Sequence, residues 1–530
     1  MLYSKNNPLF KEKYMRFFNT AGPINPEIHY YVPHRLNEIE LQQLVDQQKY
    51  FILHAPRQSG KTTAMRIYVD QLNATGKYKA LYVNVEPAQI ARGNVNEGMK
   101  IILKEIQGAA KISLPSNDPI FGYIEEVLQN LSGSSLKEVL QDWSSSLSLP
   151  IIIFIDEIDS LVGDTLISVL RQLRAGYTNR PKNFPQSLCL IGVRDVRDYR
   201  VWSTQENNFV LGGSAFNIKA ESLTLSNFSL DQIRMLYLQH SDDTGQQFTD
   251  EAIEYAFYLT QGQPWLVNAL AYQACFKDVT DRSKPITKEI IEQAKETLIL
   301  RRDTHIDQLI HKLHEPRVRK IIDAILSGQD TPEDFPIDDI SYVMDLGLIA
   351  KHAKSLTIAN PIYQEVIPRE LSYATQLTIT QQLSWYQNPD KSLNMHKLFE
   401  AFTQFYRENS AIWLEKFAYK EAGPHLLLMA FLQRIINGGG KIHREYALGT
   451  KRVDLLIELN TQRIVIELKI KRNKKTIPEG LEQTAHYMDT NNATEGHLVV
   501  FDPNVAKSWD EKISIQEHVV GKQKITVWCM

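Results

Sequence analysis

A stretch of eight residues that begins at Ala55 constrains the fold of this chain more than any other feature. It reads Ala-Pro-Arg-Gln-Ser-Gly-Lys-Thr, which is the pattern A-x-x-x-x-G-K-T with alanine where glycine is more common. An apolar run of strand length precedes it at 50–54, and a helix-like segment follows it from Thr63. This order predicts a phosphate-binding loop, because the backbone N–H groups and the helix N-terminus then face one anion.

The residues of this loop have distinct expected roles. Lys61 would reach the β- and γ-phosphates of a bound nucleotide, and Thr62 would hold Mg²⁺. The residues expected to contact the nucleotide are Ala55, Arg57, Gln58, Ser59, Gly60, Lys61, Thr62 and Thr63. The alternative is a chance Gly-Lys-Thr in a polar loop, which the flanking strand and helix patterns disfavour.

A second apolar run, at 150–155, ends in Asp156 and Glu157. A continuous apolar run is typical of a buried parallel strand, and ligands of open α/β sheets bind at the carboxyl ends of such strands. We therefore expect Asp156 to hold Mg²⁺ and Glu157 to orient or polarise the attacking water. Two acids after a strand can also be a solvated turn, but together with the upstream loop they predict ATP hydrolysis.

The composition limits the class of protein. A chain of 530 residues suggests about three or four domains. The net charge of −3 gives no overall sign of nucleic-acid binding. Cys189, Cys275 and Cys529 are too scattered for a disulfide framework or a zinc site, so a reducing cytoplasm is expected. No apolar stretch approaches the roughly 20 residues that span a bilayer, so no membrane partner is expected.

Strand-like and helix-like segments alternate through the first part of the chain, with strands at 50–54, 79–86, 150–156 and 187–193. This alternation predicts a mostly parallel sheet covered on both faces. The expected divisions are a lead-in at 1–35, a nucleotide-binding core at 36–225, a helical lid at 226–304, a small helix-and-hairpin unit at 305–371, a helical connector at 372–410 and a C-terminal domain at 411–530. In the lead-in, Tyr30 and Tyr31 could stack on a base, but ordinary packing explains them equally well.

Two further features accompany the nucleotide motifs. The strand at 187–193 ends at Arg194, where a guanidinium could sense the γ-phosphate or merely form a salt bridge. Gly262-Gln263-Pro264 opens a helical segment, as proline does near a first helical turn. Together with the phosphate-binding loop and the acidic pair Asp156-Glu157, these residues resemble AAA-type ATPases, in the branch shared by origin-recognition-like, archaeal and STAND ATPases. The resemblance implies that Arg194 senses the nucleotide and that Pro264 lies near the adenine.

The segment 305–371 resembles the winged helix that follows the lid in this branch. Its helix at 315–327 precedes a short hairpin arm at 355–361. A winged helix can place a helix in the DNA major groove, or it can brace the nucleotide site. The segment has no dense basic cluster, which favours the brace.

The C-terminal part contains a local basic segment. Residues 441–475 hold ten lysines and arginines against four acids, a net charge of +6 in a chain of −3. Such a patch is typical of phosphate-backbone binding, although by itself a solvated charged face is the better explanation.

Acidic residues fall inside this basic segment. Two strand-like stretches, 452–458 and 463–469, are separated by a short turn, and Glu467 and Lys469 share one face of the second. If Asp454 lies opposite, two carboxylates and an ammonium converge. Two carboxylates can hold one or two Mg²⁺ ions that activate water, and a lysine can stabilise a charged phosphorane-like transition state.

A helical pattern follows, in which Gln483 and Tyr487 are one turn apart on the same face. The D…E-x-K and Q-x-x-x-Y arrangement resembles the PD-(D/E)xK nucleases. The resemblance adds an acid on the first helix, for which Glu421 is the candidate, although Pro424 places it before that helix. Other positions that fit the family pattern are His425, Gly449 and Arg452.

The whole chain thus resembles a bacterial AAA-like ATPase fused to a C-terminal PD-(D/E)xK domain. The implied fold is α/β, a parallel-sheet P-loop core with a helical lid and winged helix plus a C-terminal mixed-sheet, restriction-endonuclease-like domain. The implied cofactors are ATP and Mg²⁺, with Mn²⁺ as a substitute at the nuclease site. The implied partners are nucleic acid, DNA before RNA, and a second copy of the chain.

The implied function is an ATP-hydrolysing protein with a Mg²⁺-dependent nuclease, in defence against phage or mobile elements. The catalytic residues would be Glu157, Asp454, Glu467, Lys469, Gln483 and Tyr487. The metal ligands would be Thr62 and Asp156 at the nucleotide, and Glu421, Asp454 and Glu467 at the nuclease site. The alternative is a STAND-type ATPase switch whose inactive nuclease-like domain only binds nucleic acid or a protein partner.

Overall fold

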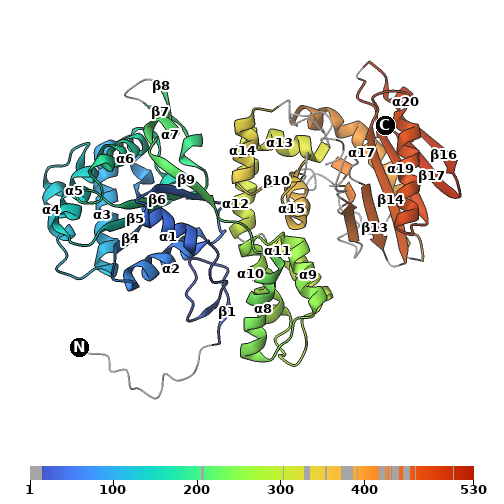
Figure 1. Cartoon of the computed structure of the whole chain (residues 1–530). Helices are drawn as coiled ribbons and strands as arrows, with labels where there is room; N and C mark the ends of the chain where they lie inside the picture. Colours follow the sequence, from blue (N-terminus) through green and yellow to red (C-terminus); the bar gives the residue numbers. More distant parts are fainter. Residues whose placement is uncertain are drawn as a thin grey trace. The chain divides into compact units, whose positions relative to one another are not determined.

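The computed structural model divides the chain into two compact units (Figure 1). The first comprises Met1–His305 with Met344–Gly347, and the second comprises Ile306–Val343 with Leu348–Met530. The structure describes residues 15–530 except 204–207, 302–303, 328–334, 353–354, 372–385, 391, 417–423, 425–426, 429–430, 433–440, 446–453, 460 and 505. Among these described residues, no helix is long and apolar enough to cross a bilayer.

Five parallel strands form the central sheet of the first unit, in the spatial order β4-β5-β6-β3-β9. Their bounds are β3 Tyr50–His54, β4 Lys79–Asn84, β5 Ile151–Asp156, β6 Ser187–Gly192 and β9 Lys219–Thr224. The predicted parallel sheet is confirmed. The edge strand β9 was not foreseen, because its sequence is largely polar and it pairs only with β3.

Alternate residues along the strands face different helices, as the pleat of a sheet requires. Phe51 and Phe154 pack with α1 and α2, whereas Ile52 and Ile153 pack with α3 to α6. The helix bounds are α1 Glu38–Asp46, α2 Lys61–Ala74, α3 Val95–Ser113, α4 Ile120–Gln129, α5 Ser135–Ser146 and α6 Gly163–Gly176. Both faces of the sheet are therefore covered, and the face under α2 carries Asp156 because Phe154 and Asp156 are two residues apart.

Short elements fill the connections of this core. They are η2 Glu86–Ala91, η3 Ile158–Ser160, η4 Tyr177–Asn179, η5 Val196–Asp198, the antiparallel pair β7 Arg200–Ser203 and β8 Asn208–Leu211, and α7 Gly212–Ala215. The connection from β5 to α6 is not one continuous helix. A single 3-10 turn comes first, and α6 starts only at Gly163, whose φ of +60° breaks the helical path.

The remaining helices of the first unit form a bundle. Their bounds are α8 Leu230–Thr244, α9 Asp250–Thr260, α10 Pro264–Gln273, the π-helical turn η6 Ala274–Asp278 and α11 Lys288–Arg301. Two short parallel strands of the lead-in, β1 Phe17–Phe18 and β2 His29–Tyr30, lie against this bundle rather than against the sheet.

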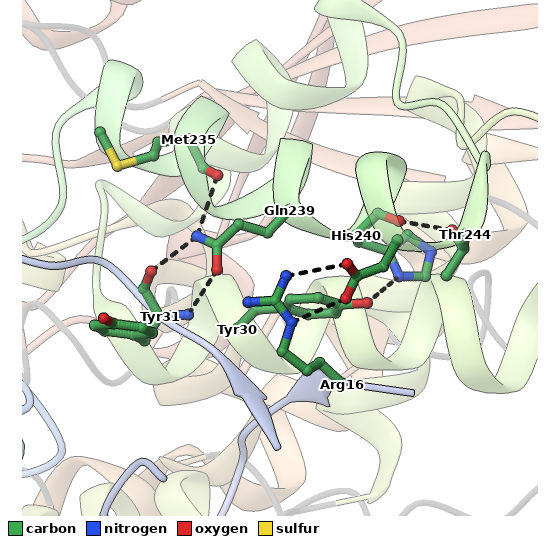
Figure 2. A network of polar contacts seen from close by, with 8 residues as sticks. Arg16, Tyr30, Tyr31, Met235, Gln239, His240 and Thr244 are labelled. Carbon is green, nitrogen blue, oxygen red and sulfur yellow. Dashed lines mark hydrogen bonds and ion pairs between the residues drawn. The ribbon is translucent and has the colours of Figure 1, made fainter. Parts of the chain in front are cut away.

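A polar network fixes the lead-in to α8 (Figure 2). The Arg16 guanidinium donates to both carboxylate oxygens of Asp243, at 2.9 and 3.1 Å. The Tyr30 hydroxyl lies 3.3 Å from Nδ1 of His240. Because the Tyr30 side chain is fully buried here, it packs in the core and offers no face to a base.

Gln239 extends the network by one residue (Figure 2). Its side-chain amide accepts from the backbone N–H of Tyr31 at 3.3 Å and donates to the Tyr31 carbonyl at 2.8 Å. One side chain thus imitates the pairing of a neighbouring strand, which holds the lead-in in an extended conformation along α8.

The second unit begins with helices and a hairpin in the order expected of a winged helix. The bounds are α12 Thr304–Leu313, which starts at the end of the first unit, α13 Pro316–Ser327, α14 Ile337–Asp345, the antiparallel pair β10 Ile349–His352 and β11 Ser355–Ile358, and α15 Pro361–Leu371. The long helix α17 runs from Met395 to Lys416. The boundary expected between 410 and 411 therefore falls inside one continuous helix.

A six-stranded mixed sheet forms the C-terminal part, in the order β12-β13-β14-β15-β17-β16. Its elements are β12 Lys441–Glu445, β13 Asp454–Leu459, β14 Gln462–Ile470, α19 Thr476–Thr490, β15 Glu495–Phe501, α20 Trp509–Lys512, β16 Ser514–Val520 and β17 Gln523–Cys529. The strands β14, β15 and β17 are parallel and the other pairs antiparallel, so the predicted mixed sheet is confirmed.

Two helices cover the two faces of this mixed sheet. On one face, Leu456, Val465 and Leu498 pack in a cluster with residues of α19. On the other, Phe399 of α17 has its ring centroid 5.1 Å from those of both His497 and Trp528. Glu467 and Lys469 alternate in phase with Val465, so they belong to the α19 face.

Candidate functional site

The phosphate-binding loop, residues 55–62, joins β3 to α2. Gly60 precedes α2 with φ of +91°, a left-handed conformation that suits glycine. A Cβ atom at Gly60 would come within 2.7 Å of Nη1 of Arg35. Gln58 is also left-handed, with φ of +57°. The loop is thus bent twice before the helix starts.

Lys61 is the buried cation of this loop, with 7% of its surface exposed. Its ammonium donates to the carbonyl oxygens of Ala55 at 2.7 Å and Pro56 at 3.0 Å. Burial lowers the pKa of Lys61, while the carboxylates of Asp156 and Glu157 oppose that shift. Among the described residues the ammonium is held by these loop carbonyls, which it can exchange for phosphate oxygens, and this fits a nucleotide.

Asp156 is fully buried at the end of β5 and accepts three hydrogen bonds. Its Oδ2 atom accepts from the hydroxyls of Thr62, at 2.7 Å, and Tyr82, and its Oδ1 accepts from the backbone N–H of Glu157 at 2.8 Å. A carboxylate and a hydroxyl in contact beside the loop are the oxygen ligands that Mg²⁺ prefers. The residues present therefore fit a nucleotide-bound Mg²⁺ ion.

Glu157 adopts an uncommon backbone for a residue with a side chain, with φ of +57° and ψ of +39°. Such strain persists only where the surroundings impose it, and it is concentrated at functional sites. Burial, with repulsion from Asp159 and Asp156, raises the pKa of Glu157 to about 7. A carboxylate with a pKa near neutrality suits a group that accepts a proton from water.

The other expected loop residues have different surroundings. Arg57 is exposed, whereas the Ser59 hydroxyl is buried and has no hydrogen-bond partner among the described residues. The Thr63 hydroxyl accepts from the backbone N–H of Ile24 at 3.2 Å, so this residue ties α2 to the lead-in.

Arg194 lies just beyond β6 and is mostly buried. Its Nε donates to Oδ2 of Asp345 at 3.0 Å. Burial raises the pKa of Asp345, and the Arg194 guanidinium opposes that shift. The Arg194 guanidinium thus forms a salt bridge with an acid 151 residues further along the chain. Nothing in the sequence near Arg194 could have identified this partner.

Pro264 is the first residue of α10, after Gly262 with φ of +72°. A Cβ atom at Gly262 would come within 1.9 Å of the carbonyl oxygen of Phe228, so only glycine fits there. The next residue, Trp265, stacks on His305, and the His305 imidazole hydrogen-bonds the Gln58 amide. The loop and α10 are therefore connected through His305, which belongs to no recognisable sequence motif.

Arg35 is a second residue without a sequence signal. Its guanidinium donates to the carbonyl oxygens of Ser59 and Ser226 and lies 4.6 Å from the centre of the Phe228 ring. Burial lowers the pKa of Arg35 to about 10. Arg35 thus joins the phosphate-binding loop to the connection that leads into the α8–α11 bundle.

The second candidate site lies on the hairpin of β13 and β14. Asp454 is the first residue of β13 and is the register partner of Glu467 on β14. The Glu467 side chain is 1% exposed, and its Oε1 lies 2.6 Å from Nζ of Lys469. Glu421 lies outside the described residues, as do His425, Gly449 and Arg452.

Gln483 and Tyr487 lie on α19, the helix that covers the Glu467 face of the sheet. The Tyr487 ring packs against the cluster that includes Leu456 and Val465. The side-chain oxygen of Gln483 is buried without a hydrogen-bond donor in the described part of the chain. A buried amide oxygen that faces no protein donor is suited to accept a hydrogen bond from a bound water or to act as a ligand of a metal ion.

The basic segment is only partly described. Arg463 pairs with Glu458 at 2.8 Å, at the turn end of the hairpin, and Lys471 lies 3.4 Å from Asp502. The backbone N–H groups of Arg472 and Asn473 donate to the Thr476 hydroxyl at the start of α19. The lysines and arginines from 469 to 475 therefore connect the end of β14 with the first turn of α19.

Comparison with known proteins gives two family matches. Residues 19–368 match the model of an AAA-like domain, and residues 390–504 match a domain of unknown function (DUF8371). No curated protein sequence matches the chain.

Several solved structures are similar to about two thirds of the chain. The Walker-type ATPase PABY2304 of Pyrococcus abyssi is 15% identical, covers 66% of this chain and 99% of its own, and has a TM-score of 0.48. The ORC2 protein of Aeropyrum pernix, in ADPNP–ADP complexes, is 15% identical over 65% of this chain and 96% of its own, with a TM-score of 0.38. Cdc6p from Pyrobaculum aerophilum is 16% identical over 65% and 95%, with a TM-score of 0.35.

The family assignment rests on the match to residues 19–368, which is more than half of the chain. The loop with Lys61 and Thr62 and the strand that ends at Asp156 both fall within it. The chain therefore belongs to the AAA-like domain family, and this domain is a P-loop ATPase-like nucleotide-binding unit that supports ATP hydrolysis.

Proposed function

We propose that ATP binding and hydrolysis in the AAA-like domain regulate a Mg²⁺-dependent phosphodiester-cleaving nuclease formed by the C-terminal domain. The observation that carries the proposal is the buried Glu467 carboxylate, 2.6 Å from the Lys469 ammonium and paired in register with Asp454. At a metal site, the carboxylate of an interior strand can bind the ion, and a lysine two residues later can orient the metal-bound water.

At the nucleotide site, each residue has a separate task. Lys61 would bind the β- and γ-phosphates, and Thr62 and Asp156 would hold Mg²⁺, which supplies charge neutralisation of the phosphates. Glu157 would accept a proton from the attacking water, for which its pKa near 7 is suited. Arg194 would sense the γ-phosphate, and Pro264 would lie at the adenine.

At the nuclease site, Asp454 and Glu467, with Glu421 as a further candidate, would hold Mg²⁺ or Mn²⁺. The metal supplies Lewis acidity and lowers the pKa of bound water. Lys469 would orient that water and stabilise the charge on the phosphate in the transition state. Gln483 and Tyr487, one helical turn apart on α19, would help to position the phosphate and the water.

The choice of substrate rests on charge. The lysines and arginines between 469 and 475 lead from the Glu467 strand to the first turn of α19, which is suited to a phosphate backbone. We propose DNA as the substrate, and defence against phage or mobile elements as the role. Three free cysteines fit a reducing cytoplasm. Self-association of the chain is proposed as the state in which ATP acts.

The test is cleavage of linear and circular duplex DNA with Mg²⁺ or Mn²⁺, with and without ATP. Glu467→Ala and Asp454→Ala should reduce the cleavage rate by about a thousandfold, because each removes a metal ligand. Glu458→Ala is the matched control, since Glu458 pairs with Arg463 at the other end of the same hairpin. It should cut at the rate of the original protein.

The role of ATP is tested in the same assay with Lys61→Ala. A change in cleavage by Lys61→Ala, in either direction, would support coupling between the two sites. ATP hydrolysis without cleavage of any DNA or RNA would contradict the nuclease proposal. It would favour an ATPase switch whose C-terminal domain only binds nucleic acid or a protein.

A further inference from the structure

Tyr82 on β4 donates a hydrogen bond to the buried carboxylate at the nucleotide site. Its hydroxyl and that of Thr62 share the Oδ2 atom of Asp156. Thr62 and Asp156 belong to recognisable motifs, whereas Tyr82 lies in an ordinary apolar strand sequence. The hydroxyl is therefore a polar group at the site to which the nucleotide motifs assign no role.

The sheet brings Tyr82 to this position through its register. Tyr82 pairs with Phe154 on the neighbouring strand, and Asn84 pairs with Asp156. Tyr82 and Phe154 belong to the cluster under α2, so both side chains are on the face of the sheet that α2 covers. The Tyr82 hydroxyl thus reaches past its register partner Phe154 to Asp156, the next residue on the same face of β5.

The two hydroxyls on Oδ2 differ in what they do when Mg²⁺·ATP binds. The hydroxyl at the Thr62 position of a phosphate-binding loop is a ligand of Mg²⁺. Its oxygen binds the metal through a lone pair, so its position is then set by the ion as well as by Asp156. Tyr82 and the backbone N–H of Glu157 also donate to the two carboxylate oxygens, and neither of these donors has a part in binding the metal itself.

We propose that Tyr82 is a positioning residue for Mg²⁺, which acts by holding the Asp156 carboxylate in the orientation that faces the metal. The inference rests on the proposed Mg²⁺·ATP site. Interactions behind a metal ligand commonly change metal affinity by 10- to 100-fold. The effect of the hydroxyl should therefore appear in the metal dependence of nucleotide binding.

Tyr78 provides a matched control in the same region. Its ring also packs against the cluster under α2, and its hydroxyl also donates to a carboxylate, that of Asp46. Asp46 is at the end of α1 and is not one of the nucleotide-site residues. Tyr78→Phe and Tyr82→Phe therefore each remove one hydroxyl from one carboxylate and leave the ring in place.

The experiment measures ADP binding to the full-length protein by titration calorimetry, once with Mg²⁺ and once with EDTA. The Kd in EDTA divided by the Kd in Mg²⁺ gives the gain in affinity that the metal provides. ADP is not hydrolysed, so no turnover disturbs the measurement. Tyr82→Phe should reduce this ratio about tenfold, the effect of one hydrogen bond to a charged group, and leave the Kd in EDTA unchanged. Tyr78→Phe should leave both values unchanged.

Each other outcome has a definite meaning. An original protein that gains no affinity from Mg²⁺ would overturn the proposed Mg²⁺·ATP site, and the inference with it. If Mg²⁺ increases the ADP affinity of Tyr82→Phe as much as that of the original protein, the proposed Mg²⁺·ATP site is not overturned, whereas the inference about Tyr82 is. An equal loss of affinity in Mg²⁺ and in EDTA would also overturn it, because the hydroxyl would then support the fold and not the metal.

Discussion

His305 stacks on Trp265 with the two ring centroids 4.8 Å apart and the ring planes 21° apart. The same imidazole hydrogen-bonds the side-chain amide of Gln58, a left-handed residue in the phosphate-binding loop. Burial lowers the pKa of His305 to about 4. The loop is therefore supported, at one of its two left-handed residues, by a histidine that is neutral at pH 7.

This contact predicts a dependence of stability on pH. Unfolded His305 binds a proton near its ordinary pKa of 6.5, whereas the folded protein resists protonation down to about 4. The contribution of neutral His305 to the free energy of unfolding is therefore complete above pH 6.5. It is lost as the pH falls, and the loss is about 3 kcal/mol in total. His305→Phe keeps a ring on Trp265 but cannot titrate. Its apparent thermal midpoint should fall less than that of the original protein between about pH 7 and pH 4.5, and parallel curves would contradict the prediction.

Substitution of Glu157 should separate hydrolysis from binding. Glu157→Gln keeps the size of the side chain but cannot accept a proton, so kcat for ATP should fall by about 10²- to 10³-fold. The Kd for ATP, measured separately, should change less than threefold, because Lys61 and the loop N–H groups remain. Unchanged kcat would show that another group accepts the proton.

The salt bridge of Arg194 allows its two possible roles to be distinguished. If Arg194 senses the γ-phosphate, Arg194→Ala should lower kcat about tenfold to a hundredfold. Asp345→Asn removes only the acidic partner and should leave kcat within a few-fold of the original value. Equal losses in the two variants would mean that Arg194 acts only as one half of a structural ion pair.

Gly60→Ala should weaken nucleotide binding for two reasons. Alanine is strained at φ of +91°, and its Cβ would approach Arg35. We expect the Kd for ADP to rise about tenfold. Gly76→Ala is the control, because Gly76 has φ of +66° and nothing within 4 Å of a Cβ there. Equal Kd values for the two variants would mean that the loop tolerates the side chain.

The central sheet and the nucleotide motifs were predictable because they are local. The runs that became β3, β5 and β6 are apolar on both faces, as buried parallel strands must be, and the motifs follow them directly. The pairing of Asp454 with Glu467 follows from a short turn between two strands. In each case the sequence distance is small and the chain has few alternatives.

The remainder depended on contacts between distant segments. His305 meets Gln58 across 247 residues, and Arg35 meets Ser226 across 191. Neither has a motif, because a histidine and an arginine in a helical or turn sequence are equally common on a solvated surface. Tyr82 reads as a core residue, and its ring is one; only the strand register shows that its hydroxyl meets Asp156.

The path of the lead-in has a mechanical consequence. From Arg16, which lies on the α8–α11 bundle, the chain enters the sheet domain through the segment at Arg35 and returns to the bundle through the segment at Ser226. Two backbone crossings thus connect the two bodies, and the Arg35 guanidinium joins them at the same level. A displacement of the bundle relative to the sheet would therefore require the Arg35 guanidinium to release Ser226 and the His305 imidazole to release Gln58.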